Sequence, residues 1–480
     1  MRRSTTSAPA YPWLLLLFVF IYPLLFFPGT LLGKPPVVTP LDNILASEQF
    51  LYLPKLLFLL VVGVLGLWEV RKQITKSVFL FLLLAHLLLV ILSTLNARDE
   101  TAFDLLGPSQ RFDGILYHLG LFALGAFAYL SLRGAPLHFR PVALALVVGC
   151  GVQAAIVVLQ RLDLDPVTPL RLWQDFNTPL GTLGHPGMVA ALLLPGILVA
   201  LWHGFADPRP GYRLLWLGAA LFSAAGLGIT GNSAAFYALV ATLIAMNLWW
   251  RKWLLFLLSA LLVVGVLVPR TVLPDPRSFE QDSQSYQDTH TLQTRLVIWQ
   301  IALRAIQETP LQPVLGGGSD ALKLAQIRNP PFDLLAEQYA LEFGWPRDAR
   351  LQDAYIKTFP GEDIKIRDRW IAFNFERFGG QQNVTKEFGF AIDRAHNFVL
   401  DRWLAFGLLS TLIWLVLYLY PVYLSLRNNH WLGWVFVALM IYYLAWFPVM
   451  QVEPIHLVLL AAAWALLPRV AKVPPPTTPT

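Results

Sequence analysis

The chain has little charge and almost no cysteine. Only 14% of its 480 residues are Asp, Glu, Lys or Arg, whereas 56% are hydrophobic and the mean hydropathy is +0.56. So few charged side chains cannot cover several soluble domains, which excludes a soluble multidomain enzyme and indicates a membrane protein. The single cysteine, Cys150, excludes a disulfide framework and a cysteine-based metal site. The 31 Phe, 17 Trp and 15 Tyr exclude a disordered chain.

Long apolar runs dominate what is present. A helix needs about 20 mostly apolar residues to cross a bilayer. The first run follows Arg2 and Arg3 but is too long for a signal peptide and has no small-residue cleavage site, so we expect it to remain as a span. The runs predict an all-α polytopic membrane protein with about 12 transmembrane helices. They lie at roughly 12–33, 50–68, 77–95, 113–132, 141–160, 186–203, 213–230, 233–250, 253–268, 396–426, 430–449 and 454–468.

The distribution of Lys and Arg predicts the orientation. Cytoplasmic connections are enriched in these residues. With the N-terminus inside, most basic residues of the short connections are cytoplasmic, and only Lys34, Arg98, Arg111, Arg161 and Arg171 lie in the short outside segments. Both termini are then cytoplasmic, and the long connection between the ninth and tenth spans lies outside.

The long connection between the ninth and tenth spans divides the chain into three expected parts. We expect transmembrane helices 1–9 over residues 1–268, an extracytoplasmic (periplasmic) loop domain over 269–395, and helices 10–12 with a cytoplasmic tail over 396–480. The loop has 127 residues, with 15 Lys/Arg and 17 Asp/Glu, and a loop this long is usually functional. Residues 294–307 have the pattern of an amphipathic helix, and 310–327 that of a turn and a second helix. We therefore expect a mainly helical loop domain.

Ionisable residues near the outer face are candidate functional residues, because such groups are costly in a membrane. His396 stands where the loop gives way to the tenth span, and histidine readily accepts a proton near neutral pH. Asn397 follows it, and Leu400 and Leu404 fall on the same face of the expected helix. The alternative is an ordinary interfacial histidine that caps the loop.

Three further residues are candidates. Arg295 begins an amphipathic helix, and its planar fork suits a phosphate; the turn Gly316–Gly318 would let backbone approach a ligand. Arg111 precedes the fourth span beside Asp113, and His185 lies at the outer mouth of the sixth span. The alternatives are a solvated helix face for Arg295, a rim salt bridge for Arg111, and a structural histidine at a helix start.

Four segments together resemble the O-antigen ligase and O-antigen polymerase superfamily of bacterial membrane glycosyltransferases. His396-Asn397, nine residues and then Gly407 is similar to the ligase pattern of His, a small amide or Ser, nine residues and Gly. Twelve spans with one large outer loop between the ninth and tenth also agree with the ligases. The other three similar segments are SQRFDGILYHLG (109–120), GTLGHPGMVAALLLPG (181–196) and TRLVIWQIALRAIQETPLQPVLGGGSD (294–320).

The chain departs from the family pattern in one turn. The family usually has Thr-x-Ser-Arg before the eighth span; here Thr230 is retained, but Asn232 and Ser233 stand where Ser and Arg would fall. Either Arg111 or another loop arginine supplies the missing charge, or the donor differs, or the activity is altered. A smaller departure is Ser410, where ligases tend to have Gly, Thr or Tyr.

The resemblance implies a substrate class and roles for the candidates. The donor would be a glycan on polyprenyl (undecaprenyl) diphosphate, and the acceptor a hydroxyl of a glycolipid, glycan or protein at the outer face of the bacterial inner membrane. His396 would act as general base, Arg295 and Arg111 would hold the diphosphate, and Asn397 and His185 would support them. We identify no carboxylate-rich metal motif, so we assign no residue to a metal and expect a metal-independent enzyme. We expect no cofactor, because the diphosphate lipid is already activated.

Several functions remain open. A ligase would use lipid A-core as acceptor, a polymerase another lipid-linked repeat unit, and a protein O-oligosaccharyltransferase a Ser or Thr. A lipid or solute transporter is the alternative from another class, although the two halves lack similarity and the notable polar residues gather at one face. A non-catalytic binding protein derived from the family is a third interpretation.

Overall fold

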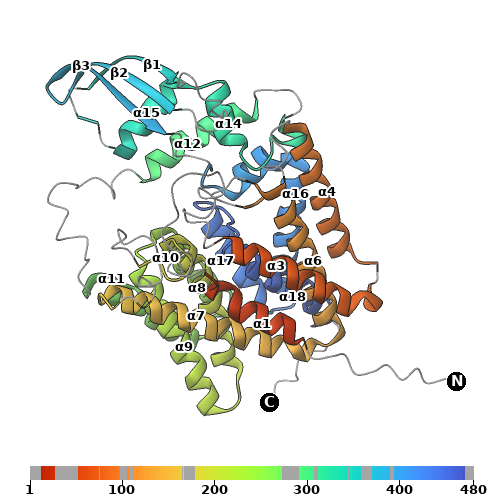
Figure 1. Cartoon of the computed structure of the whole chain (residues 1–480). Helices are drawn as coiled ribbons and strands as arrows, with labels where there is room; N and C mark the ends of the chain where they lie inside the picture. Colours follow the sequence, from red (N-terminus) through yellow and green to blue (C-terminus); the bar gives the residue numbers. More distant parts are fainter. Residues whose placement is uncertain are drawn as a thin grey trace.

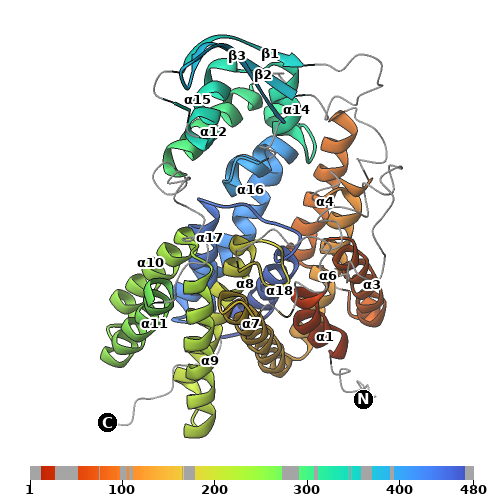
Figure 2. The ribbon, with the colours of Figure 1, turned by 60° about the vertical axis from the view of Figure 1, so that its left-hand side comes forward.

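The computed structural model describes most of the chain. Its helices form a membrane part, and a smaller cap of helices and strands lies against one end of it (Figures 1 and 2). The described residues are 12–26, 52–74, 76–97, 105–107, 112–164, 166, 179–272, 291–307, 312–343, 345–346, 349–357, 370–389 and 394–470.

The membrane part keeps the predicted order of apolar helices. Within the described ranges, nine helices are long and apolar enough to cross a membrane. Three shorter apolar helices stand where the other three runs were predicted, so the membrane-spanning class is confirmed, whereas a count of twelve spans stays a prediction. The long helices are α3 (Leu53–Val70), α4 (Val78–Ala97), α6 (Ile115–Gly134), α7 (Phe139–Arg161), α8 (Pro186–Ala206), α9 (Pro210–Ile229), α10 (Ser233–Trp250), α11 (Trp253–Val272) and α16 (Phe398–Arg427), and the short ones α1 (Trp13–Ile21), α17 (Leu432–Tyr443) and α18 (Glu453–Val470).

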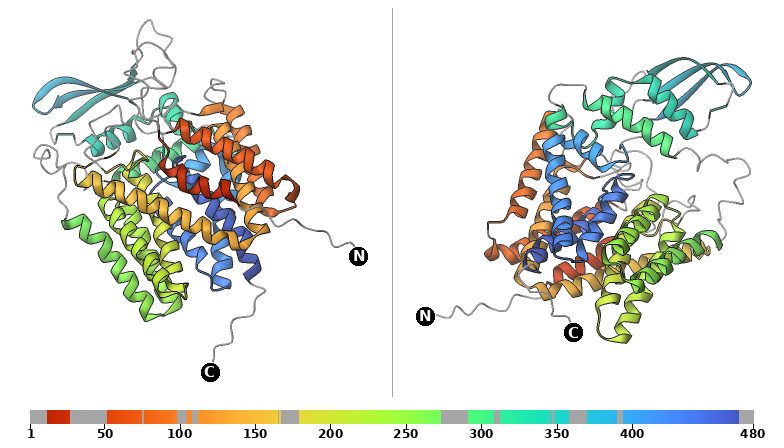
Figure 3. Two further views of the ribbon diagram at one scale, coloured as in Figure 1. Left: turned by 60° about the horizontal axis from the view of Figure 1, so that its bottom comes forward. Right: turned by 180° about the vertical axis from the view of Figure 1, so that it is seen from behind.

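Burial within the membrane part identifies its centre and its lipid-facing edge. Helix α8 is the most buried of the long helices and contacts α7, α9, α10 and α17. Helices α10 and α11 lie at the periphery (Figure 3), where large apolar side chains such as Trp253 and Phe256 are exposed. Such exposure in a helix of span length is expected where lipid rather than water is the neighbour.

The cap contains both predicted helices. Helix α12 (Thr291–Ile306) buries one apolar face, and α13 (Gln312–Leu315), a glycine turn and α14 (Ala321–Arg328) follow in the predicted order. Helix α15 (Phe332–Phe343) completes the helical layer, and the cap has an apolar core of its own.

The expectation of an all-α fold is wrong, because the cap contains a sheet in addition to its helices α12–α15. Strands β1 (Arg350–Lys357), β2 (Trp370–Phe378) and β3 (Gln381–Gly389) pair antiparallel in the order β1-β2-β3. The sheet lies on the side of the cap helices away from the membrane helices (Figures 1 and 2).

Two sequence signals for this sheet were overlooked. In β2, Ile371, Phe373 and Phe375 occupy alternate positions and are fully buried, which is the two-residue period of a strand with one covered face. The Phe373 ring packs on Tyr339 of α15, with 5.4 Å between centroids. The pair Gly379–Gly380, both with positive φ, forms the tight turn of the β2–β3 hairpin.

The glycine-rich turn of the cap docks on a kink in α16. Gly407 has φ 81° and ψ 169° inside that helix, which interrupts its hydrogen-bond ladder. The backbone N–H groups of Gly317 and Gly318 donate to the carbonyls of Leu404 and Ala405, each at 2.9 Å. We predicted that this turn lets backbone approach a ligand; in the structure its N–H groups instead bond to α16 and hold the cap against that helix.

Candidate active site

His396 lies directly before α16. It has φ 52°, so it is not helical, and the prediction that it shares a helical face with Leu400 and Leu404 is wrong. Its Nδ1 lies 3.2 Å from the carbonyl oxygen of Arg394. Because a carbonyl only accepts, Nδ1 carries the proton and donates it to that oxygen, which leaves the lone pair on Nε2. The ring thus has the tautomer that a base acting through Nε2 requires.

The backbone on both sides of His396 is held by the first turn of α16. The Asp401 carboxylate accepts from the N–H of Ala395 at 2.6 Å and from that of Asn397 at 3.2 Å. Asn397 is the N-cap, and its side chain accepts from the N–H of Val399 at 3.0 Å. A left-handed conformation costs a non-glycine residue roughly 1–2 kcal/mol, and these bonds offset that cost.

Two of the candidate histidines, His396 and His185, contact the same indole ring, that of Trp446. Trp446 lies in the segment between α17 and α18, and its centroid is 5.4 Å from that of His396 and 5.2 Å from that of His185. Phe447 packs edge-on against His396 at 5.0 Å. His185 also caps α8, since its Nδ1 accepts from the N–H of Gly187 at 3.0 Å. The structural interpretation of His185 is therefore confirmed, and the histidine lies beside the site as well.

Helix α12 directs Arg295 toward the same place. One turn after Arg295, Trp299 donates its indole N–H to the carbonyl of Ala395, the residue before His396, at 3.0 Å. Burial lowers the pKa of Arg295, and the nearby Tyr442 hydroxyl on α17 acts in the opposite direction. Tyr442 is one turn from Trp446, with 6.3 Å between ring centroids. His396 and His185 thus both contact Trp446, and the neighbouring Tyr442 is close enough to Arg295 to influence its pKa.

Arg295 has no carboxylate partner among the residues that the structure describes. Arg304 on the same helix differs, because its guanidinium pairs with Asp333 at 3.1 Å and is exposed. A partly buried guanidinium without a counter-ion in the described chain favours an anionic ligand.

Arg111, the other predicted diphosphate ligand, lies outside the described residues. Asp113 is described, and its carboxylate pairs with Arg394 rather than lying free at a rim. Both side chains of this pair are largely covered, with exposed fractions of 10% for Arg394 and 19% for Asp113. This ion pair connects the start of α6 to the segment that carries His396.

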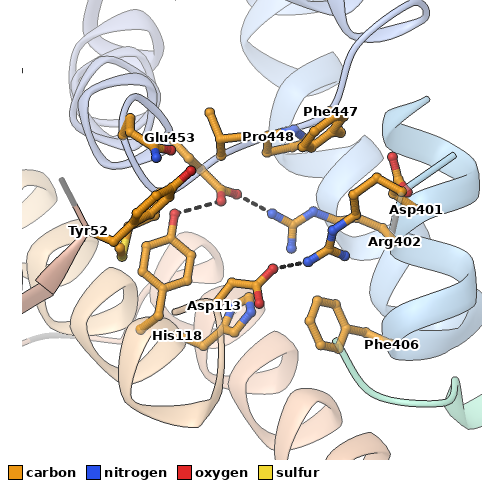
Figure 4. A pocket seen from close by; sticks show the side chains of 14 residues that line it. Tyr52, Asp113, His118, Asp401, Arg402, Phe406, Phe447, Pro448 and Glu453 are labelled. Carbon is orange, nitrogen blue, oxygen red and sulfur yellow. Dashed lines mark hydrogen bonds and ion pairs between the residues drawn. The ribbon is translucent and has the colours of Figure 1, made fainter. Parts of the chain in front are cut away.

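A pocket lies between the starts of several membrane helices, and Phe447, which packs on His396, is part of its lining (Figure 4). Two ion pairs stand in it, Arg394 with Asp113 and Arg402 with Glu453, and the Tyr117 hydroxyl donates to the second Glu453 oxygen at 2.8 Å. The pocket is lined by residues from the starts of α3, α6, α16 and α18 and from the segment after α17. They are Tyr52, Asp113, Tyr117, His118, Arg394, Asp401, Arg402, Phe406, Phe447, Pro448, Val449, Met450, Gln451 and Glu453.

Comparison with known families agrees with the resemblance. The O-antigen ligase family model matches residues 218–346. This stretch carries an O-antigen ligase domain. It runs from α9 to the residues after α15, and it includes Ser233, Arg295 and the glycine turn but ends before His396. No curated protein matches the chain. Residues 218–346 are thus similar to the O-antigen ligase family, and they lie in a chain whose described residues include nine helices long and apolar enough to cross a membrane.

Within the O-antigen ligase domain, the position of the missing arginine has a guanidinium from another helix. Arg270 at the end of α11 donates to the Ser233 hydroxyl, with 3.2 Å between Nη2 and Oγ. Arg111 lies outside the described residues, and among those described Arg270 is the arginine that contacts Ser233.

Sequence reasoning missed the buried polar residues below the pocket. Arg402 Nη1 lies 3.3 Å from His86 Nε2, and His86 in turn lies 3.3 Å from His118 and 2.8 Å from the Ser410 hydroxyl. Arg402, His86 and His118 fall inside predicted spans, and this intramembrane position was the signal that could have found them. Among the described residues no group of three His, Cys, Asp or Glu side chains could hold a metal ion.

Proposed function

We propose that this protein is a glycosyltransferase of O-antigen ligase type, which moves a glycan from a polyprenyl diphosphate to an acceptor hydroxyl. The observation that carries the proposal is the convergence of His396 and Arg295, about 100 residues apart in the sequence, on the Trp446 and Tyr442 rings under the cap. The reaction requires a proton acceptor and a cation for the departing diphosphate.

The residues suggest how the transfer proceeds. His396 Nε2 takes the proton of the acceptor hydroxyl while that oxygen bonds to the anomeric carbon of the donor. The bond from this carbon to the diphosphate oxygen breaks, and its electron pair leaves with the diphosphate. Arg295 stabilises the charge on the leaving group, and Arg111 is the second proposed ligand. Asn397 and His185 hold the helix ends beside the base.

We also propose that the cap is periplasmic and both termini are cytoplasmic. The pocket is formed at the starts of α3, α6, α16 and α18 and after the end of α17. All of these helix ends lie toward the outer face in the orientation that the basic residues favour. The donor lipid would lie along the exposed apolar faces of the spans.

The proposal is tested by His396→Ala in cells that depend on this protein for surface glycan. We expect transfer to fall by about 10²–10⁴-fold, the usual contribution of a general base, while lipid-linked donor accumulates at the outer leaflet. Surface glycan and lipid-linked donor are quantified at equal membrane expression. His138→Ala, at the other end of α6, is the control and should transfer normally.

The possible outcomes separate the functions. Full transfer by His396→Ala would reject His396 as the base. Donor trapped at the cytoplasmic leaflet would indicate a transporter. The product that disappears identifies the acceptor: capped lipid A-core for a ligase, long polymer for a polymerase, and glycosylated protein for a protein O-oligosaccharyltransferase.

A further inference from the structure

The pocket beside His396 shares two residues with the surroundings of that histidine. Arg394, whose carbonyl accepts from His396, and Phe447, whose ring packs on His396, both line it. A molecule in this pocket therefore touches direct neighbours of the imidazole, although His396 itself is not part of the lining. Arg295 approaches the imidazole through other neighbours, namely Trp299 with Ala395 and Tyr442 with Trp446.

The charges of the pocket do not suit a diphosphate. Its two arginines are already paired, Arg394 with Asp113 and Arg402 with Glu453. A third carboxylate, Asp401, accepts two backbone N–H groups. Three carboxylates against two guanidinium groups leave an excess of negative charge, which disfavours an anionic ligand. All three carboxylates are already paired or hydrogen-bonded, so the groups left for a ligand are the uncharged ones.

The Gln451 side chain is the group in the pocket to which a ligand would hydrogen-bond. This side chain is fully buried and lines the pocket, and within the described residues neither its amide nitrogen nor its amide oxygen has a hydrogen-bond partner. Arg402 Nε is also buried and has no hydrogen-bond partner in the part of the chain that the structure describes. Buried polar atoms are almost always hydrogen-bonded, so these three atoms require an explanation. An amide offers one kind of donor and one acceptor side by side, which matches hydroxyl groups that both donate and accept.

The apolar part of the lining fits the same kind of ligand. Phe406, Phe447 and the aromatic rings of Tyr52 and Tyr117 present carbon surface between the polar groups. A sugar has this combination of C–H faces and hydroxyl edges. A phosphate has no C–H face, and an acyl chain has no hydroxyl groups.

We infer that this pocket binds the hydroxyl-bearing edge of a neutral acceptor sugar, with Gln451 as its specificity-determining residue. The inference rests on the proposed function and adds the acceptor side of the site. The acceptor hydroxyl reaches His396 from the pocket, while the donor diphosphate lies on the side of Arg295. As in the proposed transfer, the acceptor oxygen bonds to the anomeric carbon and the bond from that carbon to the diphosphate oxygen breaks.

The experiment uses Gln451→Leu in full-length protein in nanodiscs. Leucine has a similar volume, and no internal hydrogen bond is lost, so the variant should unfold at or above the wild-type temperature. The probes are lipid A-core glycolipid without O-antigen and undecaprenyl diphosphate. We expect the Kd for the glycolipid to rise about tenfold or more, and the Kd for undecaprenyl diphosphate to stay within about twofold. Gln300→Leu, on the exposed side of α12, should bind both as wild type does.

Three results would overturn the inference. Unchanged glycolipid binding would mean that the pocket holds only water. Weaker binding of undecaprenyl diphosphate alone would place the donor there. No binding of the glycolipid to wild-type protein would remove the acceptor assignment. The proposed function is tested by a different experiment: it is rejected if the His396→Ala variant transfers glycan normally, whatever the result for Gln451→Leu.

Discussion

At the residue scale, the candidate site depends on how each polar side chain is held. His396 is strained and fixed by the Asn397 cap and by Asp401, and backbone strain of this kind clusters at functional sites. Arg295 differs from Arg304 on the same helix, because Arg304 is exposed and paired with Asp333. Chemical identity alone therefore does not distinguish the two arginines; their burial and partners do.

This contrast gives a matched pair of variants. Arg295→Ala should weaken binding of undecaprenyl diphosphate by about 10–100-fold, because hydrogen bonds to a charged group contribute about 1.5–3 kcal/mol each. Arg304→Ala should bind it as wild type does, since it loses only an exposed ion pair. The measurement is equilibrium binding in nanodiscs. Equal affinities for the two variants would remove Arg295 from the diphosphate site.

At the element scale, the kink of α16 joins the cap to the membrane part. Gly407 has a backbone conformation that side chains rarely adopt, and a Cβ there would collide with the carbonyl oxygen of Val314 in α13. The carbonyls of Leu404 and Ala405, freed by the kink, accept from the glycine turn. The glycine that ends the His-Asn-x9-Gly pattern thus has a structural role, because it allows the backbone of α16 to lie in contact with the backbone of α13 and the glycine turn.

Gly407→Ala should therefore detach or unfold the cap. The conformational cost alone is about 1–3 kcal/mol, and the backbone clash adds to it. We expect faster trypsin cleavage within the cap and a lower unfolding temperature in detergent. Gly218→Ala in α9, where a Cβ meets nothing within 4 Å, is the control and should leave both unchanged. A stable, protease-resistant Gly407→Ala protein would contradict this account of the kink.

At the scale of the whole molecule, a buried polar network joins four helices. Arg402 of α16 pairs with Glu453 of α18, contacts His86 of α4, and stacks over Trp414 with 4.2 Å to the ring centroid. Tyr117 of α6 completes the pairing of the Glu453 carboxylate. Since α16 begins beside His396, the network also fixes the position of His396 relative to the pocket.

Breaking this ion pair on one side should be more harmful than removing it altogether. Glu453→Gln leaves Arg402 charged and buried, which we expect to cost about 3–5 kcal/mol of stability. The double variant Arg402→Met/Glu453→Gln removes the charge and should recover a large part of that loss. Thermal unfolding of the purified proteins in one detergent measures both. Additive destabilisation in the double variant would show that the two residues act independently.

The amino-acid sequence by itself determined the membrane class, the order of the apolar helices, the amphipathic helix that became α12, and His396 as a candidate base. These follow from local pattern, because hydropathy and helical period are properties of neighbouring residues. Only the tertiary structure decided that Arg295 and His396 lie near two neighbouring rings, Tyr442 and Trp446, that the glycine turn packs on α16, and that Gln451 lines a pocket. Such meetings join segments far apart in the chain, and no local pattern records which distant backbone or side chain a residue will meet.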